Sequence, residues 1–254
     1  MTEVTSRFVV EGLLRADRTA ALAEVYDVGN ALGIADQPMR LTIRRLVAGG
    51  DWVQEGRGRA GVLRHVGEAG RHDPEFVRFA YRRDAGEHPW DGWWHLVVFT
   101  VPESERARRD AVRRNLLRLG GAPLHPGVYV SPDGFADVPE GAWTASTRDL
   151  RHEGVHHPPE LAARLWPLDE IALRYERLAL LSAQPPPTGR IESLRRALEL
   201  AAAFDHAMVP DPLLPRELLP ENWPPATARA AFRDRWAALR KTGGHRLFEN
   251  YDVS

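Results

Sequence analysis

The chain has 254 residues, of which 43% are apolar, and a formal net charge of −1 at pH 7. This length and apolar content allow two to three small domains or one large one with a real hydrophobic core, and they exclude a wholly disordered chain. The absence of cysteine excludes disulfide frameworks, thiolate catalysis and cysteine-ligated zinc, and therefore also zinc-finger DNA binding.

Residues 1–66 are predicted to form a winged helix-turn-helix, an N-terminal DNA-binding domain. Three short helices come first, and the third begins at Asp36, whose side chain can accept hydrogen bonds from the free N–H groups of the first turn. A hairpin with Gly56-Arg57-Gly58-Arg59 at its tip follows, because glycine between two apolar runs is typical of a turn between strands. The expected helices cover residues 6–15, 22–32 and 36–48, and the expected strands begin at Trp52 and Gly61.

The third helix separates apolar from basic residues. Met39, Ile43, Leu46 and Val47 follow the i, i+4, i+7, i+8 spacing that places one stripe against a core. Residues 36–64 contain six arginines and three acids, a local charge of +3 in a chain whose net charge is −1. A groove-binding patch requires local positive charge of this kind. The residues expected to contact DNA are Gln37, Arg40, Leu41, Arg44 and Arg45 on the helix and Arg57 and Arg59 on the wing.

These side chains match the base edges that are displayed in the major groove. Arginine can donate to guanine or to phosphate, Gln37 can pair with adenine, and Leu41 can contact a thymine methyl group. Arg57 and Arg59 at the hairpin tip can reach phosphates or the minor groove. The alternative is a basic helix face that is only solvated, and the charge pattern alone favours neither interpretation.

Residues 67–89 have the glycine, proline and mixed charge of a connector, with a short helix around residues 75–81. A middle α+β domain of ferredoxin-like type is predicted for residues 90–160, with helices on one face of an antiparallel sheet. Its expected elements are a strand at 94–101, a helix at 104–119 capped by Ser104, a strand at 124–130 and a further strand at 143–150.

Residues 161–254 are predicted to form an all-helical C-terminal domain, so that the chain as a whole is a multidomain α+β protein. Apolar residues at helical spacing run from Leu168 to Leu178 and from Ile191 to Ala201, and a last amphipathic helix is expected at 226–240. Residues 210–224 are too rich in proline for a helix interior and too apolar for a solvated linker. This stretch is therefore expected to lie against other residues.

Three stretches in this order resemble the PaaX-like transcriptional regulators, the repressor family of bacterial phenylacetic acid degradation. The resemblance spans nearly the whole chain. A winged helix alone is weak evidence, because many unrelated proteins contain one, whereas the ordered set is much more specific. The stretches are residues 39–47 with the following Gly-Arg hairpin, Pro89-Trp90-Asp91-Gly92-Trp93-Trp94 leading to residues 126–132, and residues 211–224.

The resemblance implies an N-terminal winged helix, a middle domain similar to the small ferredoxin-like nuclease of CRISPR adaptation systems, a helical C-terminal domain and a dimeric assembly. It also implies repression of catabolic genes and release of DNA when an aryl-acyl-coenzyme A thioester binds. The chain departs from the family pattern at Thr100, where members commonly carry an acidic residue at the end of the first sandwich strand. It departs again at residues 133–150, which are too short and too rich in proline for the usual second sandwich helix.

A histidine-rich segment offers an alternative, metal-binding site. His152, His156 and His157, together with Glu153 and Glu160, have a spacing that could hold a metal ion. Prolines interrupt the segment and no pair of these residues lies four apart on an evident helix. A solvated loop is therefore the favoured interpretation, and no metal is expected.

Aromatic residues offer a second alternative, because a flat ligand could stack on them. Packing anchors are the more common role of such side chains, and that interpretation is favoured. The two groups are Trp90, Trp93 and Trp94, and Trp223, Phe232 and Trp236.

The sequence therefore predicts a cytoplasmic, dimeric transcriptional regulator, a repressor without catalytic residues or cofactor. Its expected partners are a double-stranded operator with an inverted repeat, a second copy of the chain and a small-molecule effector such as an acyl-coenzyme A thioester, for which the sequence indicates no binding residues. No membrane is expected, because the chain has neither a run of eighteen apolar residues nor a charged-then-apolar leader.

The alternative function is a metal-dependent nuclease that uses the ferredoxin-like domain, with the winged helix as a targeting module. Thr100 disfavours it, since hydrolysis of phosphodiesters needs carboxylates that hold Mg²⁺, and Asp91 and Glu103 lie outside the ends of the first strand. A third possibility is a DNA-binding protein without any effector.

Overall fold

The computed structural model describes residues 4–15, 17–66, 74–100, 105–240 and 251. The chain divides into two compact units, each built from separated stretches of sequence. Unit 1 comprises Met1–Arg78, Arg174–Ala207 and Ala226–Ser254, and unit 2 comprises Phe79–Leu173 and Met208–Pro225. The domain bounds that we expect from the sequence remain a prediction.

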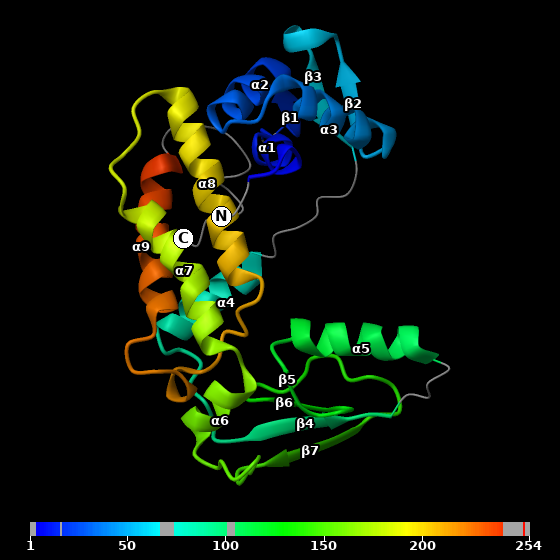
Figure 1. Cartoon of the computed structure of the whole chain (residues 1–254), viewed down its shortest axis with the longest axis vertical. Coiled ribbons are helices and arrows are strands. Elements are labelled where there is room, and N and C mark those ends of the chain that lie inside the picture. The colour runs from blue at the N-terminus through cyan, green and yellow to red at the C-terminus, as the bar shows by residue number, and fades with distance from the viewer. Residues whose placement is uncertain (1–3, 16, 67–73, 101–104, 241–250, 252–254) are drawn as a thin grey trace. The chain divides into compact units, whose positions relative to one another are not determined.

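The N-terminal part of unit 1 combines three helices with a small antiparallel sheet (Figure 1). Its elements are α1 (Ser6–Gly12), β1 (Thr19–Ala21), α2 (Leu22–Ala31), α3 (Asp36–Ala48), β2 (Trp52–Glu55), the 3-10 turn η1 (Gly58–Ala60) and β3 (Val62–His65). β3 lies in the middle of the sheet, with Ala20 of β1 opposite Leu63 and Val53 of β2 opposite Arg64. Leu63 is fully buried, so the central strand closes the core beneath the helices.

The three helices predicted in this part are confirmed, whereas the sequence prediction does not include β1. That strand is only Thr-Ala-Ala, which is too short to show an alternating apolar pattern. The hairpin tip also differs from the prediction, because a 3-10 turn occupies Gly58–Ala60. Gly56 and Gly58 have φ angles of +76° and +59°, a backbone conformation that glycine adopts without strain.

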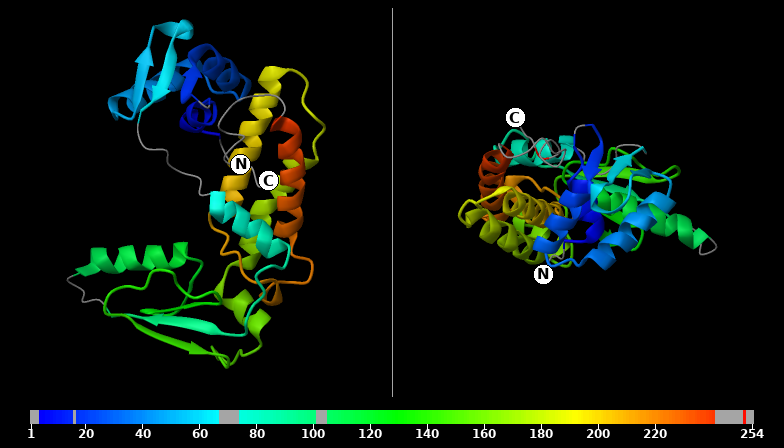
Figure 2. Two further views of the ribbon diagram at one scale, coloured as in Figure 1. Left: turned by 180° about the vertical axis from the view of Figure 1, so that it is seen from behind. Right: turned by 90° about the horizontal axis from the view of Figure 1, so that it is seen from above.

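The other part of unit 1 consists of helices that lie side by side in both views (Figures 1 and 2). They are the larger parts of α7 (Leu168–Ala183), α8 (Arg190–Met208) and α9 (Pro224–Leu239), which confirms the helices predicted along the chain here. Phe204 of α8 stacks on Phe232 of α9 with ring centroids 4.2 Å apart, and Arg229 of α9 donates to the Tyr175 hydroxyl of α7 at 2.8 Å. Among the described helices, none is both long and apolar enough to cross a bilayer.

Unit 2 is built on a four-stranded antiparallel sheet. Its elements are the end of α4 (Pro74–Asp84), β4 (Trp94–Val98), α5 (Arg106–Arg118), β5 (Ala122–His125), β6 (Val128–Ser131), β7 (Trp143–Thr147), α6 (Pro158–Leu165) and the 3-10 turn η3 (Arg216–Leu218). The strand order β5-β6-β4-β7 is that of a ferredoxin-like sheet. α5 runs along one face (Figures 1 and 2), where Leu116 packs against Val97, Phe99 and Tyr129.

The strand predicted at 124–130 is wrong, because the structure has two antiparallel strands, β5 and β6, on either side of a turn at Gly127. Gly127 has a φ of +76°, and a Cβ atom there would lie 2.5 Å from the Phe99 carbonyl oxygen. β4 ends at Val98, earlier than predicted, and the expected cap Ser104 lies outside the described residues. Residues 132–142 form turns and no helix, in agreement with the missing second sandwich helix.

Leu116→Ala is expected to lower the free energy of unfolding by about 2–5 kcal/mol, because Leu116 is 0% exposed between α5 and the sheet. Leu117→Ala, at a neighbouring side chain that is 40% exposed, should lower it by less than about 1 kcal/mol. Urea unfolding of both variants measures the difference. Equal losses would contradict this orientation of α5.

Candidate nucleic-acid interface

α3 has a buried face and an exposed face, as its sequence pattern predicts. Met39, Ile43 and Leu46 are buried, and Val47 is half-buried. Leu41 is 48% exposed, which is unusual for a leucine on a helix that has an apolar core beside it. All five helix residues expected to contact DNA lie on the exposed side: Gln37, Arg40, Leu41, Arg44 and Arg45.

The arginines of this exposed face differ in their neighbours. Arg40 lies one turn after Asp36, with its Nη2 atom 3.5 Å from the Asp36 carboxylate. Arg44 and Arg45 form neither an ion pair nor a hydrogen bond with any other described residue. The described residues therefore leave these two positive charges available, and an arginine in that condition can gain from contact with a phosphate.

The two arginines at the hairpin tip also differ from each other. Arg59 pairs with Asp27 of α2 and lies over the Tyr26 ring, with its guanidinium carbon 5.7 Å from the ring centroid. Arg59 therefore helps to fix the hairpin to α2. Arg57 is exposed and forms no ion pair with the residues that the structure describes. Of these two arginines, Arg57 is the one whose charge is not engaged by the described part of the protein.

An ion pair that sequence reasoning missed joins a buried carboxylate of α2 to a half-exposed arginine of α8. Glu24, in the first turn of α2, is 8% exposed. Arg190 donates to its Oε1 atom from Nε at 3.0 Å and from Nη2 at 2.5 Å, and the Nη2 atom of Arg15 lies 3.5 Å from Oε2. No local pattern reveals this contact, because Glu24 and Arg190 are 166 residues apart. α2 packs beside α3, so this ion pair helps to hold in place the helix that supports α3.

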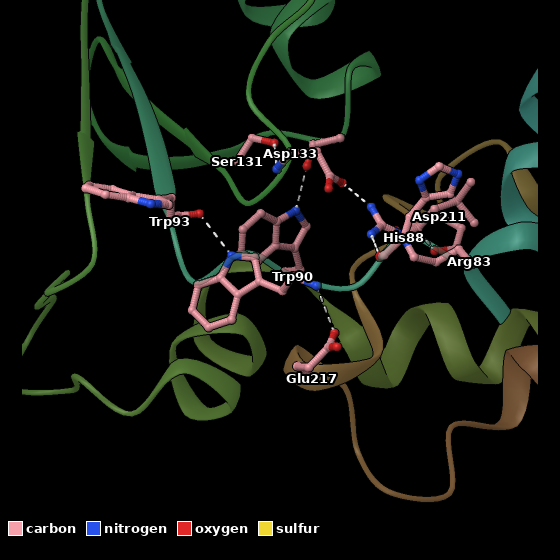
Figure 3. A network of polar contacts seen from close by, with 11 residues as sticks. Arg83, His88, Trp90, Trp93, Ser131, Asp133, Asp211 and Glu217 are labelled. Carbon is pink, nitrogen blue, oxygen red and sulfur yellow. Dashed lines mark hydrogen bonds and ion pairs between the residues drawn. The ribbon is translucent and has the colours of Figure 1, made fainter. Parts of the chain in front are cut away.

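Unit 2 contains a buried cation, Arg83, at the end of α4 (Figure 3). Its side chain is 5% exposed and lies over the Phe79 ring at 4.9 Å. The guanidinium donates to the His88 carbonyl, to the Asp133 carboxylate and, from Nε at 3.1 Å, to the Leu213 carbonyl. Arg83 therefore joins three segments that are far apart in the sequence, which periodicity cannot predict.

The proline-rich stretch at 210–224 lies against the rest of unit 2, as expected, since Leu213, Leu214 and Leu218 are buried. Leu213 has a φ of +52°, a conformation that is costly for a residue with a side chain. The Asp211 carboxylate accepts from its N–H at 2.9 Å, and Arg83 donates to its carbonyl. The aspartate and the leucines of this stretch thus have a structural role.

The tryptophans near the start of β4 pack against one another, in agreement with the favoured interpretation. Trp94 is 0% exposed, with ring centroids 5.0 Å from Trp90 and 6.2 Å from Trp166. The Trp90 indole donates to the Trp93 carbonyl at 2.9 Å, and the Trp90 backbone N–H donates to Glu217 at 3.2 Å (Figure 3).

The aromatic group near the C-terminus also packs internally. Phe232 and Trp236 are buried, and Trp223 is half-buried. The Tyr251 ring meets Trp236 edge-on at 5.0 Å, and its hydroxyl donates to Asp205 at 2.9 Å. Burial raises the pKa of Tyr251 well above its ordinary value, and the nearby Asp205 charge acts in the same direction. Tyr251 is thus a neutral part of this core.

The residues considered for metal chemistry do not converge in the part of the chain that the structure describes. Glu153 pairs with Arg164 in a contact of 2.5 Å, which lowers the pKa of Glu153, and His157 lies 3.7 Å from Glu160. No group of three histidine, aspartate or glutamate side chains among the described residues could hold a metal ion.

The positions considered for nuclease chemistry are also placed by the structure. Thr100 is exposed just beyond β4. The Asp91 carboxylate accepts from the Trp93 backbone N–H at 2.9 Å, and so it closes a turn before the strand. Glu103 lies outside the described residues.

Comparison with known proteins finds two family matches. Residues 87–149 match the PaaX protein central Cas2-like domain, and residues 166–249 match the PaaX-like protein C-terminal domain. Among solved structures, the uncharacterised protein Rv0674 from Mycobacterium tuberculosis is 26% identical, with a TM-score of 0.59. The match covers 94% of this chain and 97% of that one. No curated protein matches the sequence.

Arg83→Gln is expected to lower the free energy of unfolding by about 3 kcal/mol, because the His88 and Leu213 carbonyls each lose a buried donor. Arg151→Gln is the matched control, since that guanidinium is 70% exposed and its ion pair with Asp149 should contribute little to stability. Chemical denaturation measures both. A loss for Arg83→Gln no larger than that for Arg151→Gln would contradict the role given to the buried guanidinium.

Proposed function

Because the chain belongs to the PaaX-like family, we propose that it is a sequence-specific DNA-binding transcriptional regulator, a dimeric repressor of catabolic genes that a small-molecule effector releases from DNA. The matches to both the central and the C-terminal domains are consistent with a PaaX-type regulator. One observation carries the proposal: α3 buries Met39, Ile43 and Leu46 and exposes Arg44 and Arg45, which have no ion-pair or hydrogen-bond partner among the described residues.

In this proposal residues 1–66 act as a winged helix-turn-helix with α3 as the recognition helix. The helices α1 to α3 and the antiparallel strands β1, β3 and β2 support it. A major groove about 12 Å wide admits an α-helix, where Arg44 and Arg45 can donate to guanine and Leu41 can contact a thymine methyl group. Arg57 on the hairpin then contacts the backbone beside the groove.

Two copies of the chain provide specific affinity in this proposal. One such DNA-binding module buries only roughly 600–1,000 Å² on DNA, which favours binding to two half-sites. Half-sites one helical turn apart, about 34–36 Å, require a dimer with matching symmetry. The operator is therefore expected to be an inverted repeat.

The effector that we propose is a small metabolite such as an aryl-acyl-coenzyme A thioester, the class that the family resemblance implies. Such a ligand releases the protein from DNA if it binds more tightly to a dimer whose recognition helices no longer match the half-site spacing. Titration of acyl-coenzyme A thioesters and aromatic acids into the protein–operator complex tests this step. A screen without any change in DNA affinity would leave a DNA-binding protein without an effector.

The experiment that tests the whole proposal is binding of the purified protein to random genomic fragments at near-physiological salt, followed by sequencing of the retained fragments. We expect an inverted repeat to be recovered, and the genes beside it would indicate the effector to examine. Diffuse, salt-sensitive retention without a common sequence would contradict sequence-specific regulation.

Arg44→Ala and Arg45→Ala are each expected to weaken operator binding by about 1–3 kcal/mol, because each removes a base contact. Arg7→Ala, an exposed position on α1, is the matched control for the loss of one positive charge. Fluorescence anisotropy on operator and on random duplex measures the effect. Equal losses on both duplexes would show that α3 does not read sequence.

Arg57→Ala is expected to reduce the slope of log affinity against log salt concentration by about 1, because the variant loses one phosphate contact. Its ratio of operator to random-DNA affinity should stay close to that of the unmodified protein. Binding titrations at several salt concentrations measure both quantities. An unchanged slope would remove Arg57 from the interface.

A further inference from the structure

α5 is the most basic element that the structure describes outside the candidate interface. Its 13 residues contain six arginines and one acid, Asp110, which makes a formal charge of +5 in a chain with a net charge of −1. Arginine replaces lysine almost everywhere in this chain, so the number of arginines alone is not informative. Their concentration on one helix is the feature that needs an explanation.

The sequence of α5 contradicts the rules that stabilise an isolated helix. The helices α2, α3, α6, α7 and α8 each have an acid in the first turn, which is favourable at the positive end of the helix dipole, whereas α1, α5 and α9 have none. α5 goes further and begins with three arginines, Arg106, Arg108 and Arg109, at this positive end. Like charges also recur at i, i+4 between Arg114 and Arg118, an arrangement that destabilises a helix. A local cost of this kind is expected where a surface serves binding.

These charges are directed away from the core of unit 2. α5 buries Leu116 and half-buries Val112 against the sheet. Glu105 lies 3.0 Å from Arg108, and Arg118 donates to the Asn115 side chain at 2.7 Å. Arg113 and Arg114 are exposed and form neither an ion pair nor a hydrogen bond with other described residues. The outer side of α5 therefore has positive charge that the described part of unit 2 does not neutralise.

We propose that α5 is a second DNA-binding surface, which contacts the phosphates of duplex DNA through Arg113, Arg114 and their neighbours without reading the bases. The inference rests on the proposed function, which supplies the DNA. Duplex DNA fits the helix in charge and length, because 13 residues extend for about 20 Å and duplex DNA has one negative charge for about every 1.7 Å of its axis. Phosphate contacts of this kind add affinity and salt dependence, whereas α3 supplies sequence preference.

The test compares double variants of the full-length protein on operator DNA and on random duplex over a range of salt concentrations. Arg113→Gln/Arg114→Gln removes two charges from α5. Arg151→Gln/Arg216→Gln removes two exposed charges from elsewhere in unit 2 and has the same net charge. Asp110→Asn makes the opposite change, because it raises the charge of α5 by one. Arg44→Gln/Arg45→Gln tests the proposed recognition helix in the same assay.

If α5 contacts phosphates, Arg113→Gln/Arg114→Gln reduces the salt slope by about 1.8, which is two contacts at about 0.9 each. It does so equally on both duplexes and leaves the ratio of operator to random-DNA affinity unchanged. Asp110→Asn strengthens binding to both duplexes. A slope equal to that of Arg151→Gln/Arg216→Gln on both duplexes overturns the inference.

The recognition-helix variant distinguishes failure of this inference from failure of the proposed function. If Arg44→Gln/Arg45→Gln abolishes operator preference while the α5 variants behave as the control, the regulator is supported and the second surface is overturned. If the α5 variants lose affinity while the recognition-helix variant loses nothing, α5 binds DNA but the proposed reading of sequence by α3 is wrong. Absence of binding to any duplex overturns both.

Discussion

The arrangement of unit 2 depends on one buried guanidinium, that of Arg83. A cation taken out of water is tolerated only when hydrogen bonds and opposite charge replace its hydration. Arg83 obtains them from the segment before β4, from Asp133 after β6 and from Leu213 in the proline-rich stretch. These segments cannot separate without leaving the charge unsatisfied. Leu213, whose carbonyl accepts one of these hydrogen bonds, has a left-handed backbone conformation, so the same side chain also helps to hold a strained residue of the proline-rich stretch.

The arginines of the candidate interface in unit 1 differ from Arg83. Arg44 and Arg45 are exposed and have no ion-pair partner among the described residues. α3 is supported from below by Met39, Ile43 and Leu46, and α2 is held by the pair of Glu24 with Arg190. Rigid support of this kind positions side chains more precisely than a loop does. Arg83 and Glu24 thus have their buried charges balanced by partners, whereas Arg44 and Arg45 of α3 and Arg113 and Arg114 of α5 are exposed and have no ion-pair partner among the described residues.

The sequence predicted what depends on local pattern and missed what depends on distant partners. The faces of α3 follow from its apolar spacing, and the missing helix after β6 follows from the short, proline-rich segment there. Pro126-Gly127 is typical of a turn, but the apolar residues on either side of it predict one continuous strand where the structure has β5 and β6. Arg83 and Glu24 could not be assigned, since their partners lie up to 130 and 166 residues away. The positive charge of α5 is evident from its sequence, but arginine is so frequent in the chain that a cluster of arginines does not by itself indicate a binding surface.

The alternation of the two units along the chain has a consequence during synthesis. Unit 2 contains Phe79–Leu173 and Met208–Pro225, and the stretch between them belongs to unit 1. At a translation rate of about 5–20 residues per second, the 130 residues from Arg83 to Leu213 require roughly 7–26 seconds. Throughout this interval the nascent guanidinium has no Leu213 carbonyl to bind, so the core of unit 2 remains incomplete while most of α8 is translated. The last part of unit 2 is therefore synthesised only after a helix of unit 1. The order of the residues in the chain thus determines when the hydrophobic core of each unit can be completed.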